Sequence, residues 1–147
     1  MRTLLIALAA MFMITVCNGQ PGMVPTTEGG YTMTATVDGK PWKAQAMYPV
    51  AANGSIHGKY GESSIDLPYW DQYKPGSKTN FKNGHGPIFA PPGDFDLYSV
   101  HSGQMEITKV TGDWMEGSFS FTATLQSDPS KKMEITNGFF RISMKKK

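Results

Sequence analysis

The feature that most constrains the fold is a run near the C-terminus in which apolar and hydroxyl side chains alternate. The apolar or small set is Met115, Gly117, Phe119, Phe121, Ala123 and Leu125, and between its last members lie Ser118, Ser120, Thr122 and Thr124. Successive side chains of a β-strand point to opposite faces, so this period of two indicates one long strand with a buried and a wet face. Such alternation is typical of antiparallel sheets.

The next residues predict the partner of this long strand. Asp128-Pro129-Ser130 is a turn sequence, because proline presets φ and short polar side chains bond to the backbone. Folding residues 132–142 back places Met133 opposite Leu125. Asn137-Gly138 favours a bulge in the returning strand.

A second hairpin is predicted at the start of the domain. Tyr31, Met33, Ala35 and Val37 alternate with threonines, and Asp38-Gly39 then supplies a turn. The apolar alternation continues in Trp42, Ala44, Ala46 and Tyr48. Pairing Val37 with Trp42 places both apolar sets on one sheet face.

Further strand-sized runs complete the pattern. Ile56–Tyr60 and Ile65–Tyr69 flank Gly61-Glu62, and Phe95–Val100 and Gln104–Val110 are separated by Gly103. No window shows a capped period of 3.6 residues, which would indicate a helix. We therefore predict an all-β domain: a single antiparallel β-sandwich or flattened β-barrel of about eight or nine strands.

The N-terminus has the pattern of an export signal. Arg2 precedes an apolar run from Leu4 to Val16 that is too short to cross a bilayer. The only cysteine of the chain, Cys17, follows this run and fits the acylated first residue of a lipoprotein. The alternative is cleavage after Gly19, which gives a secreted protein. The predicted division is 1–17 signal peptide, 18–30 flexible tether and 31–147 single β domain.

Charge and cysteine content exclude several classes of function. The formal net charge is +2 and includes Arg2, so the exported domain is nearly neutral and has no broad basic field for nucleic acid. Without Cys17 the domain has no disulfide, no thiolate nucleophile and no cysteine ligand for a metal.

Several segments carry a resemblance to a known family. They are Ser102–Lys109, Glu116–Ala123, Glu134–Phe140 and the opening Thr34–Trp42. Together they resemble a family of small β-rich Bacteroidetes lipoproteins, catalogued as a domain of unknown function (family 6252). The resemblance implies an envelope lipoprotein with a β-rich fold, held to the periplasmic or outer membrane. It implies no activity and no catalytic residues.

The most unusual segment is the Pro- and Gly-rich stretch Pro68–Gly93, which opens with Tyr69, Trp70, Asp71, Gln72 and Tyr73. Long irregular connections are often binding loops. One hypothesis is that the aromatic rings stack on a sugar or another ring, while Asp71, Gln72 and Asn80 bond to its hydroxyls. The other is that Trp70 and Tyr73 close one end of the core.

No motif for a metal or an enzyme stands out. His57, His85 and His101 come from separate segments, and Asp94-Phe95-Asp96 lacks the later ligands of a calcium loop. We predict no cofactor. Acidic residues such as Glu106, Glu116 and Glu134 are scattered, and no nucleophile motif is present, so an extracellular hydrolase is a minor alternative.

A barrel would offer one more alternative. Its apolar interior, which includes Met33, Trp42, Phe119, Phe121 and Met133, would then line a cavity for an apolar ligand. The favoured hypothesis is a non-enzymatic binding or interaction module. Its predicted partners are the membrane, through the lipid, and a glycan, a small ligand or an envelope protein, through residues 69–73.

Overall fold

The computed structural model describes residues 22–27, 29–49, 54–70, 72–82, 85–93 and 96–144. Within these ranges every regular element is a strand, which confirms the all-β prediction. None of the described residues belongs to a helix that could cross a membrane. Cys17 and the predicted signal peptide lie outside the described ranges.

The described residues form eleven strands, more than the eight or nine predicted. They are β1 (Val24–Pro25), β2 (Thr32–Val37), β3 (Lys40–Lys43), β4 (Ala46–Met47), β5 (Ser55–Tyr60), β6 (Ser63–Pro68), β7 (Lys78–Lys82), β8 (Ile88–Ala90), β9 (Tyr98–Thr111), β10 (Trp114–Leu125) and β11 (Lys132–Ser143). The additional strands are short: β1 and β4 have two residues each, and β7 and β8 lie within the segment predicted to be irregular. β1 also lies within the range predicted as a tether.

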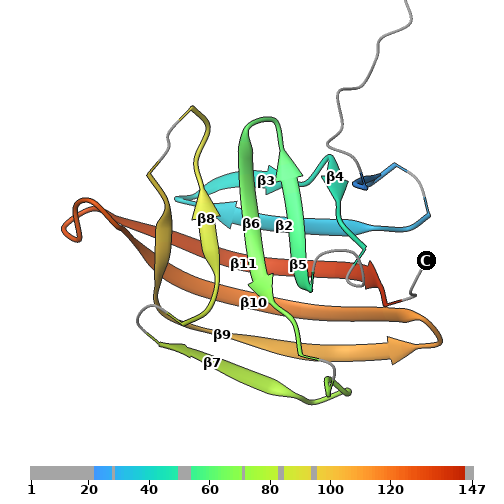
Figure 1. Ribbon diagram of the computed structural model, residues 1–147. Coiled ribbons are helices and arrows are strands. Elements are labelled where there is room, and N and C mark those ends of the chain that lie inside the picture. Colours follow the sequence, from blue (N-terminus) through green and yellow to red (C-terminus); the bar gives the residue numbers. More distant parts are fainter. Residues whose placement is uncertain are drawn as a thin grey trace, which may run out of the picture.

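All strands belong to one antiparallel sheet. Ten follow the order β1-β4-β5-β6-β8-β9-β10-β11-β2-β3, and β7 pairs with β9 beside β8. The sheet is open and curls into a half-barrel. In Figure 1, β5, β6 and β8 cross in front of the long strands β9, β10 and β11. The curl encloses the apolar faces of both sets of strands.

The chain between β3 and β4 links the two ends of the curled sheet. The amide of Ala44 donates to the carbonyl of Met33 in β2 at 2.9 Å, and the amide of Gln45 donates to the carbonyl of Lys59 in β5 at 2.7 Å. Two consecutive residues therefore hydrogen-bond to strands from opposite ends of the sheet order. The first bond continues the β2–β3 ladder by one residue, and the second joins the connection to β5.

The inner face of the sheet is the hydrophobic core. The apolar residues of the long alternating run are buried, as predicted, and face the apolar residues of the other strands. Fully buried side chains include Met33, Met47, Ile56, Ile65, Leu67, Met105, Ile107, Met115, Ile135, Phe140 and Ile142. Trp42 is also buried, and its Nε1–H donates to Ser63 Oγ at 2.8 Å. The core thus comes from nearly all strands.

The first hairpin forms where predicted but with a different register. Val37 pairs with Lys40, and Trp42 lies opposite Ala35 rather than Val37. The reason is the length of the turn: Asp38 and Gly39 both have positive φ, 46° and 76°, which is typical of a two-residue turn. This register still places Trp42 and Ala35 on the buried face.

The C-terminal hairpin differs from the prediction in the same way. Met133 lies opposite Ala123, not Leu125, because the turn is centred on Asp128 rather than Pro129; the amide of Leu125 accordingly donates to the carbonyl of Lys131. The predicted bulge is confirmed. The register between β10 and β11 shifts opposite Ser120, where Asn137 has a φ of 51°.

The two strands predicted on either side of Gly103 are a single strand, β9. Gly103 lies within it and pairs with Phe121 of β10 and Phe81 of β7. A Cβ atom on Gly103 would lie within 2.5 Å of the backbone of β10. The glycine therefore permits a close approach of two strands and does not end one.

Candidate functional site

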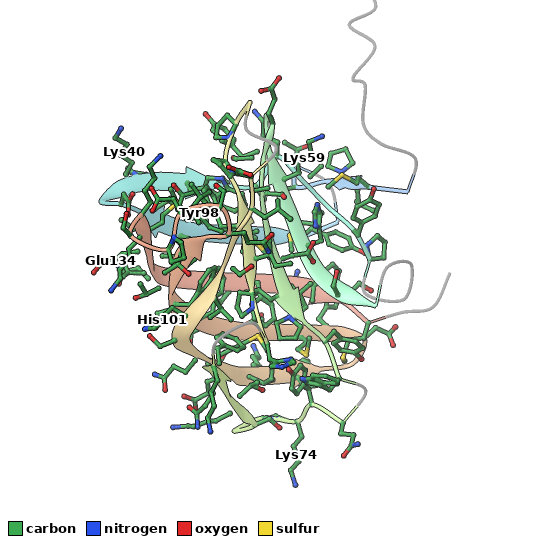
Figure 2. The ribbon with its side chains drawn as sticks, turned by 60° about the vertical axis from the view of Figure 1, so that its left-hand side comes forward. Lys40, Lys59, Lys74, Tyr98, His101 and Glu134 are labelled. Atoms are coloured by element: carbon green, nitrogen blue, oxygen red, sulfur yellow. The ribbon has the colours of Figure 1, made fainter. Side chains whose placement is uncertain are left out.

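The predicted aromatic loop lies between β6 and β7, at the opposite end of the molecule from β1. In Figure 1 β1 is near the top, whereas β7 lies along the lower edge. Figure 2 is rotated about the vertical axis and places Lys74, which belongs to the same loop, at the bottom. The first described strand and the aromatic loop are thus at opposite poles.

Two of the three aromatic residues of the loop pack on the core. The rings of Tyr69 and Tyr73 meet edge to face, with centroids 5.9 Å apart, and both are partly buried. The Tyr73 hydroxyl is within 3.4 Å of the Pro68 carbonyl and 3.3 Å of Thr79 Oγ1. Burial raises the pKa of Tyr73 above its ordinary value near 10, and the Thr79 hydrogen bond opposes this shift. These two rings form the base of the loop.

The second half of the loop is hydrogen-bonded to β9. The amide of Gly76 donates to the carbonyl of Ile107 at 2.8 Å, and the amide of Ile107 donates to the carbonyl of Ser77 at 2.9 Å. The hydroxyl of Ser77 accepts a bond from the amide of Lys74. The part of the loop that follows Tyr73 is thus held on β9.

Trp70 is the exception among the three aromatic residues. Its side chain is 58% exposed, the highest value among the large hydrophobic residues described. Its carbonyl accepts a bond from the amide of Tyr73 at 3.2 Å, which closes a tight turn. Gln72 is exposed beside it, and Asp71 lies outside the described residues. The Trp70 side chain is therefore mostly in solvent, next in the chain to the partly buried Tyr69.

The residues considered for a ligand cavity belong to the packed core. Met33, Trp42, Phe119 and Phe121 are buried in one cluster, and Met133 packs against it. The rings of Phe119 and Phe121 lie 6.3 Å apart, and Phe119 also stacks with Phe140 at 6.4 Å. These side chains therefore pack on one another within the core cluster.

Sequence reasoning missed one pair of ionisable residues. His57 in β5 and Asp66 in β6 lie opposite each other, with His57 Nδ1 2.7 Å from Asp66 Oδ2. The Tyr48 ring lies 5.2 Å from the imidazole. The signal was present, because a two-residue turn at 61–62 pairs these two positions. Cross-strand pairs of opposite charge are common in sheets, so we interpret the pair as structural.

The other histidines do not join this pair. His85 forms an isolated bridge with Lys82, and His101 is exposed on β9. The described residues contain no group of three His, Cys, Asp or Glu that could hold a metal ion. Asp94 lies outside the described ranges, so its calcium-like motif stays a sequence observation.

The acidic residues are dispersed over the outer face. Glu116 accepts a bond from Arg141 Nε at 3.2 Å, and Glu106 lies 3.4 Å from Lys78 Nζ. Glu106 and Glu134 pair with positions four residues apart on β10. With about 4.8 Å between strands and about 3.4 Å per residue, their Cα atoms are roughly 17 Å apart. Glycoside hydrolases hold their two carboxyl groups within about 10 Å, so this pair is too far apart. Glu106 and Glu116 are closer, with Cα atoms roughly 8 Å apart by the same spacing, but each carboxylate lies beside a basic side chain.

We found no match to the chain among family models, curated proteins or solved structures. The resemblance to the lipoprotein family therefore stays a prediction.

Proposed function

We propose that the protein is a non-enzymatic binding module of the cell envelope, held to a membrane by a lipid on Cys17. In this proposal it contacts its ligand through residues 69–73, with Trp70 as the main contact. The observation that supports this most is the exposure of Trp70, in a loop whose two tyrosines are packed against the core. A large aromatic side chain held in water has apolar area available for burial by a partner.

The fixed path of the second half of the loop favours binding energetically. Ordering a mobile loop costs free energy that is subtracted from the affinity. Here the Tyr73–Thr79 contact and the bonds that Gly76 and Ser77 make with Ile107 hold the second half of the loop before any ligand arrives. Stacking on Trp70 would therefore be opposed mainly by the desolvation of the ligand.

The chemistry of the loop suggests a glycan or another small ligand with an apolar ring face. Trp70 supplies a flat apolar surface, and the exposed amide of Gln72 supplies a donor and an acceptor for hydroxyl groups. The location of the loop fits a tethered protein. A tether preceding β1 would leave the opposite pole, with Trp70, facing away from the membrane.

A thermal-shift screen tests the binding proposal. The purified protein is heated with glycans, peptidoglycan fragments, lipids or divalent metals, and Trp70→Ala is screened in parallel. A ligand at about 100 times its dissociation constant adds about 2.7 kcal/mol, a shift of several degrees in a domain of this size.

The matched control is Tyr60→Ala, because Tyr60 is an exposed aromatic residue (48%) at the β5–β6 turn. The proposal expects a glycan or another small ligand to stabilise the native protein and Tyr60→Ala but not Trp70→Ala. A ligand that stabilises Trp70→Ala equally would contradict it.

The lipid anchor has its own test. Mass spectrometry of the mature protein from membranes should find an acylated Cys17 as the first residue, and Cys17→Ser should release the protein from the membrane fraction. A mature chain that begins with unmodified Gln20 would show plain secretion instead.

A further inference from the structure

A groove lies on the outer face of the long strands, on the side of the sheet opposite the core. One part, of about 400 Å³, is lined by Glu106 and Gln104 of β9, Ser118 and Ser120 of β10, and Asn137 of β11, among others. The adjoining part, of about 250 Å³, runs on past Thr122 to Glu134. Both parts share Ser120 and Thr136, so they form one groove along β10. Figure 2 shows Glu134 projecting outward from the sheet.

The groove results from the sizes of the side chains on three neighbouring strands. The outward residues of β10 are the short Ser118, Ser120 and Thr122, whereas longer side chains such as Gln104 and Glu134 flank them. Side chains on β9 and β11 are about 10 Å apart, two strand spacings. The bulge at Asn137 widens β11 opposite Ser120. A hollow therefore forms over the middle strand.

The polar groups of the groove are not used by the fold. Among the described residues, the side chains of Gln104, Ser118, Ser120, Thr136 and Asn137 make no hydrogen bond to another residue, and the Glu134 carboxylate has no partner. Hydroxyl and amide groups both donate and accept hydrogen bonds, and carboxylates accept them. The groove thus presents mixed donors and acceptors to solvent.

The groove carries two carboxylates, of which one is paired. Glu106 lies beside Lys78, whereas Lys82 of β7 is three strand spacings, about 14 Å, from Glu134 and is too far away to pair with it. No basic side chain lines the groove itself. One unpaired, exposed carboxylate disfavours anions and, in water and salt, attracts a cation only weakly. The groove therefore suits a ligand that is uncharged and rich in hydroxyl groups.

One aromatic ring adjoins the groove. Phe139 lies opposite Ser118 on the outer face and is 37% exposed. Its cross-strand neighbour on the other side is Thr34 of β2. An apolar ring beside a row of polar groups is the combination that receives the C–H face and the hydroxyl groups of a sugar.

We propose that this groove is a second binding site, distinct from the aromatic loop, and that it takes a segment of a neutral oligosaccharide chain. The ligand lies along β10, with hydroxyl groups bonded to Gln104, Asn137 and the two flanking carboxylates. The open ends of the groove accept the interior of a chain. This site does not depend on Trp70.

Isothermal titration calorimetry of the protein with neutral hexasaccharides tests the proposal. The probes are linear hexamers of glucose, mannose, galactose and N-acetylglucosamine, with hexalysine and inositol hexaphosphate as charged comparisons. Two variants, Ser120→Tyr and Thr136→Tyr, place a large side chain in the groove. Thr136 is exposed, so its replacement leaves the core unchanged even if Ser120→Tyr impairs folding. The matched control is Ser64→Tyr, an outward serine on β6 away from the groove.

We expect at least one hexasaccharide to bind the native protein, and each groove variant to weaken that binding at least about tenfold. Ser64→Tyr and Trp70→Ala should bind as the native protein does. Hexasaccharide binding that is lost in Trp70→Ala but kept in Thr136→Tyr would overturn the groove proposal and favour the aromatic loop. Binding of hexalysine or inositol hexaphosphate alone, or of no probe, would also overturn it.

Discussion

On the inner face of β10, Phe119 and Phe121 are 3% and 4% exposed, whereas Ser118 and Ser120 on the outer face contact solvent. Both sets share one backbone and the same pairing with β9 and β11. The inner residues contact the core from several strands, and the outer residues make no side-chain hydrogen bond within the described part of the fold. The comparison teaches that alternate residues of one strand have different roles. The inward residues stabilise the fold, and the outward residues leave polar groups available for binding.

The largest expected effect is on the inner face. Phe140 is fully buried and stacks with Phe119. Phe140→Ala should lower the free energy of unfolding by about 3–5 kcal/mol, because it removes a buried ring and leaves a cavity. Chemical denaturation measures this loss. A loss below about 1 kcal/mol would show that the core does not depend on this packing.

The next effect concerns added volume on the inner face. A Cβ atom on Gly117 would lie 2.5 Å from Phe140 Cζ and 2.7 Å from the carbonyl oxygen of Glu106. Gly117→Ala should therefore destabilise the domain by about 1–3 kcal/mol through overpacking. The neighbouring outward substitution Ser118→Ala is the control in the same denaturation series. Equal losses in the two variants would contradict the separation of the faces.

Arg141 faces outward, yet we expect it to stabilise the fold, unlike Ser118 and Ser120. Its guanidinium lies 4.0 Å from the centroid of the Trp114 ring, and it donates to Glu116 and to the Gly30 carbonyl. These contacts hold the segment before β2 against β10 and β11. Arg141→Met should cost about 1–2 kcal/mol in unfolding free energy, reduced by partial solvent screening. An unchanged free energy of unfolding in Arg141→Met would show that Arg141 contributes no more to stability than the other outward residues.

The smallest effect is expected in the groove. Ser120→Ala removes one hydroxyl that has no partner among the described residues. It should change the free energy of unfolding by less than about 0.5 kcal/mol. The same denaturation experiment gives the value. A larger loss would mean that the hydroxyl serves the fold, and would weaken the argument for the groove.

Much of the fold could be predicted because alternation records which face is buried. The run ending at Leu125, the bulge at Asn137 and the hairpin at Asp38-Gly39 all appear where the sequence indicates them. The pairings could not be fixed so well, because a shift of two residues keeps every apolar side chain on the same face. Trp42 and Met133 show this directly.

The candidate sites were less accessible to sequence analysis. Composition draws attention to Trp70, but which of the three aromatic residues stays exposed depends on tertiary packing, in which Tyr69 and Tyr73 contact the core and Trp70 is 58% exposed. The groove was missed because it needs three strands side by side, with Ser120 in the middle and Thr136 on the neighbour. In the sequence these residues are recognisable only as solvent-facing residues of strands.

The measurement that tests the central claim most directly is the free energy of unfolding of Trp70→Ala beside that of Trp42→Ala. Trp42 is buried and bonded to Ser63, whereas Trp70 is 58% exposed. The account predicts a loss of about 3–5 kcal/mol for Trp42→Ala and at most about 2 kcal/mol for the partly buried Trp70→Ala, which leaves most of the Trp70 ring available for a ligand. A loss of several kcal/mol in Trp70→Ala would make it part of the core and contradict the proposed binding loop.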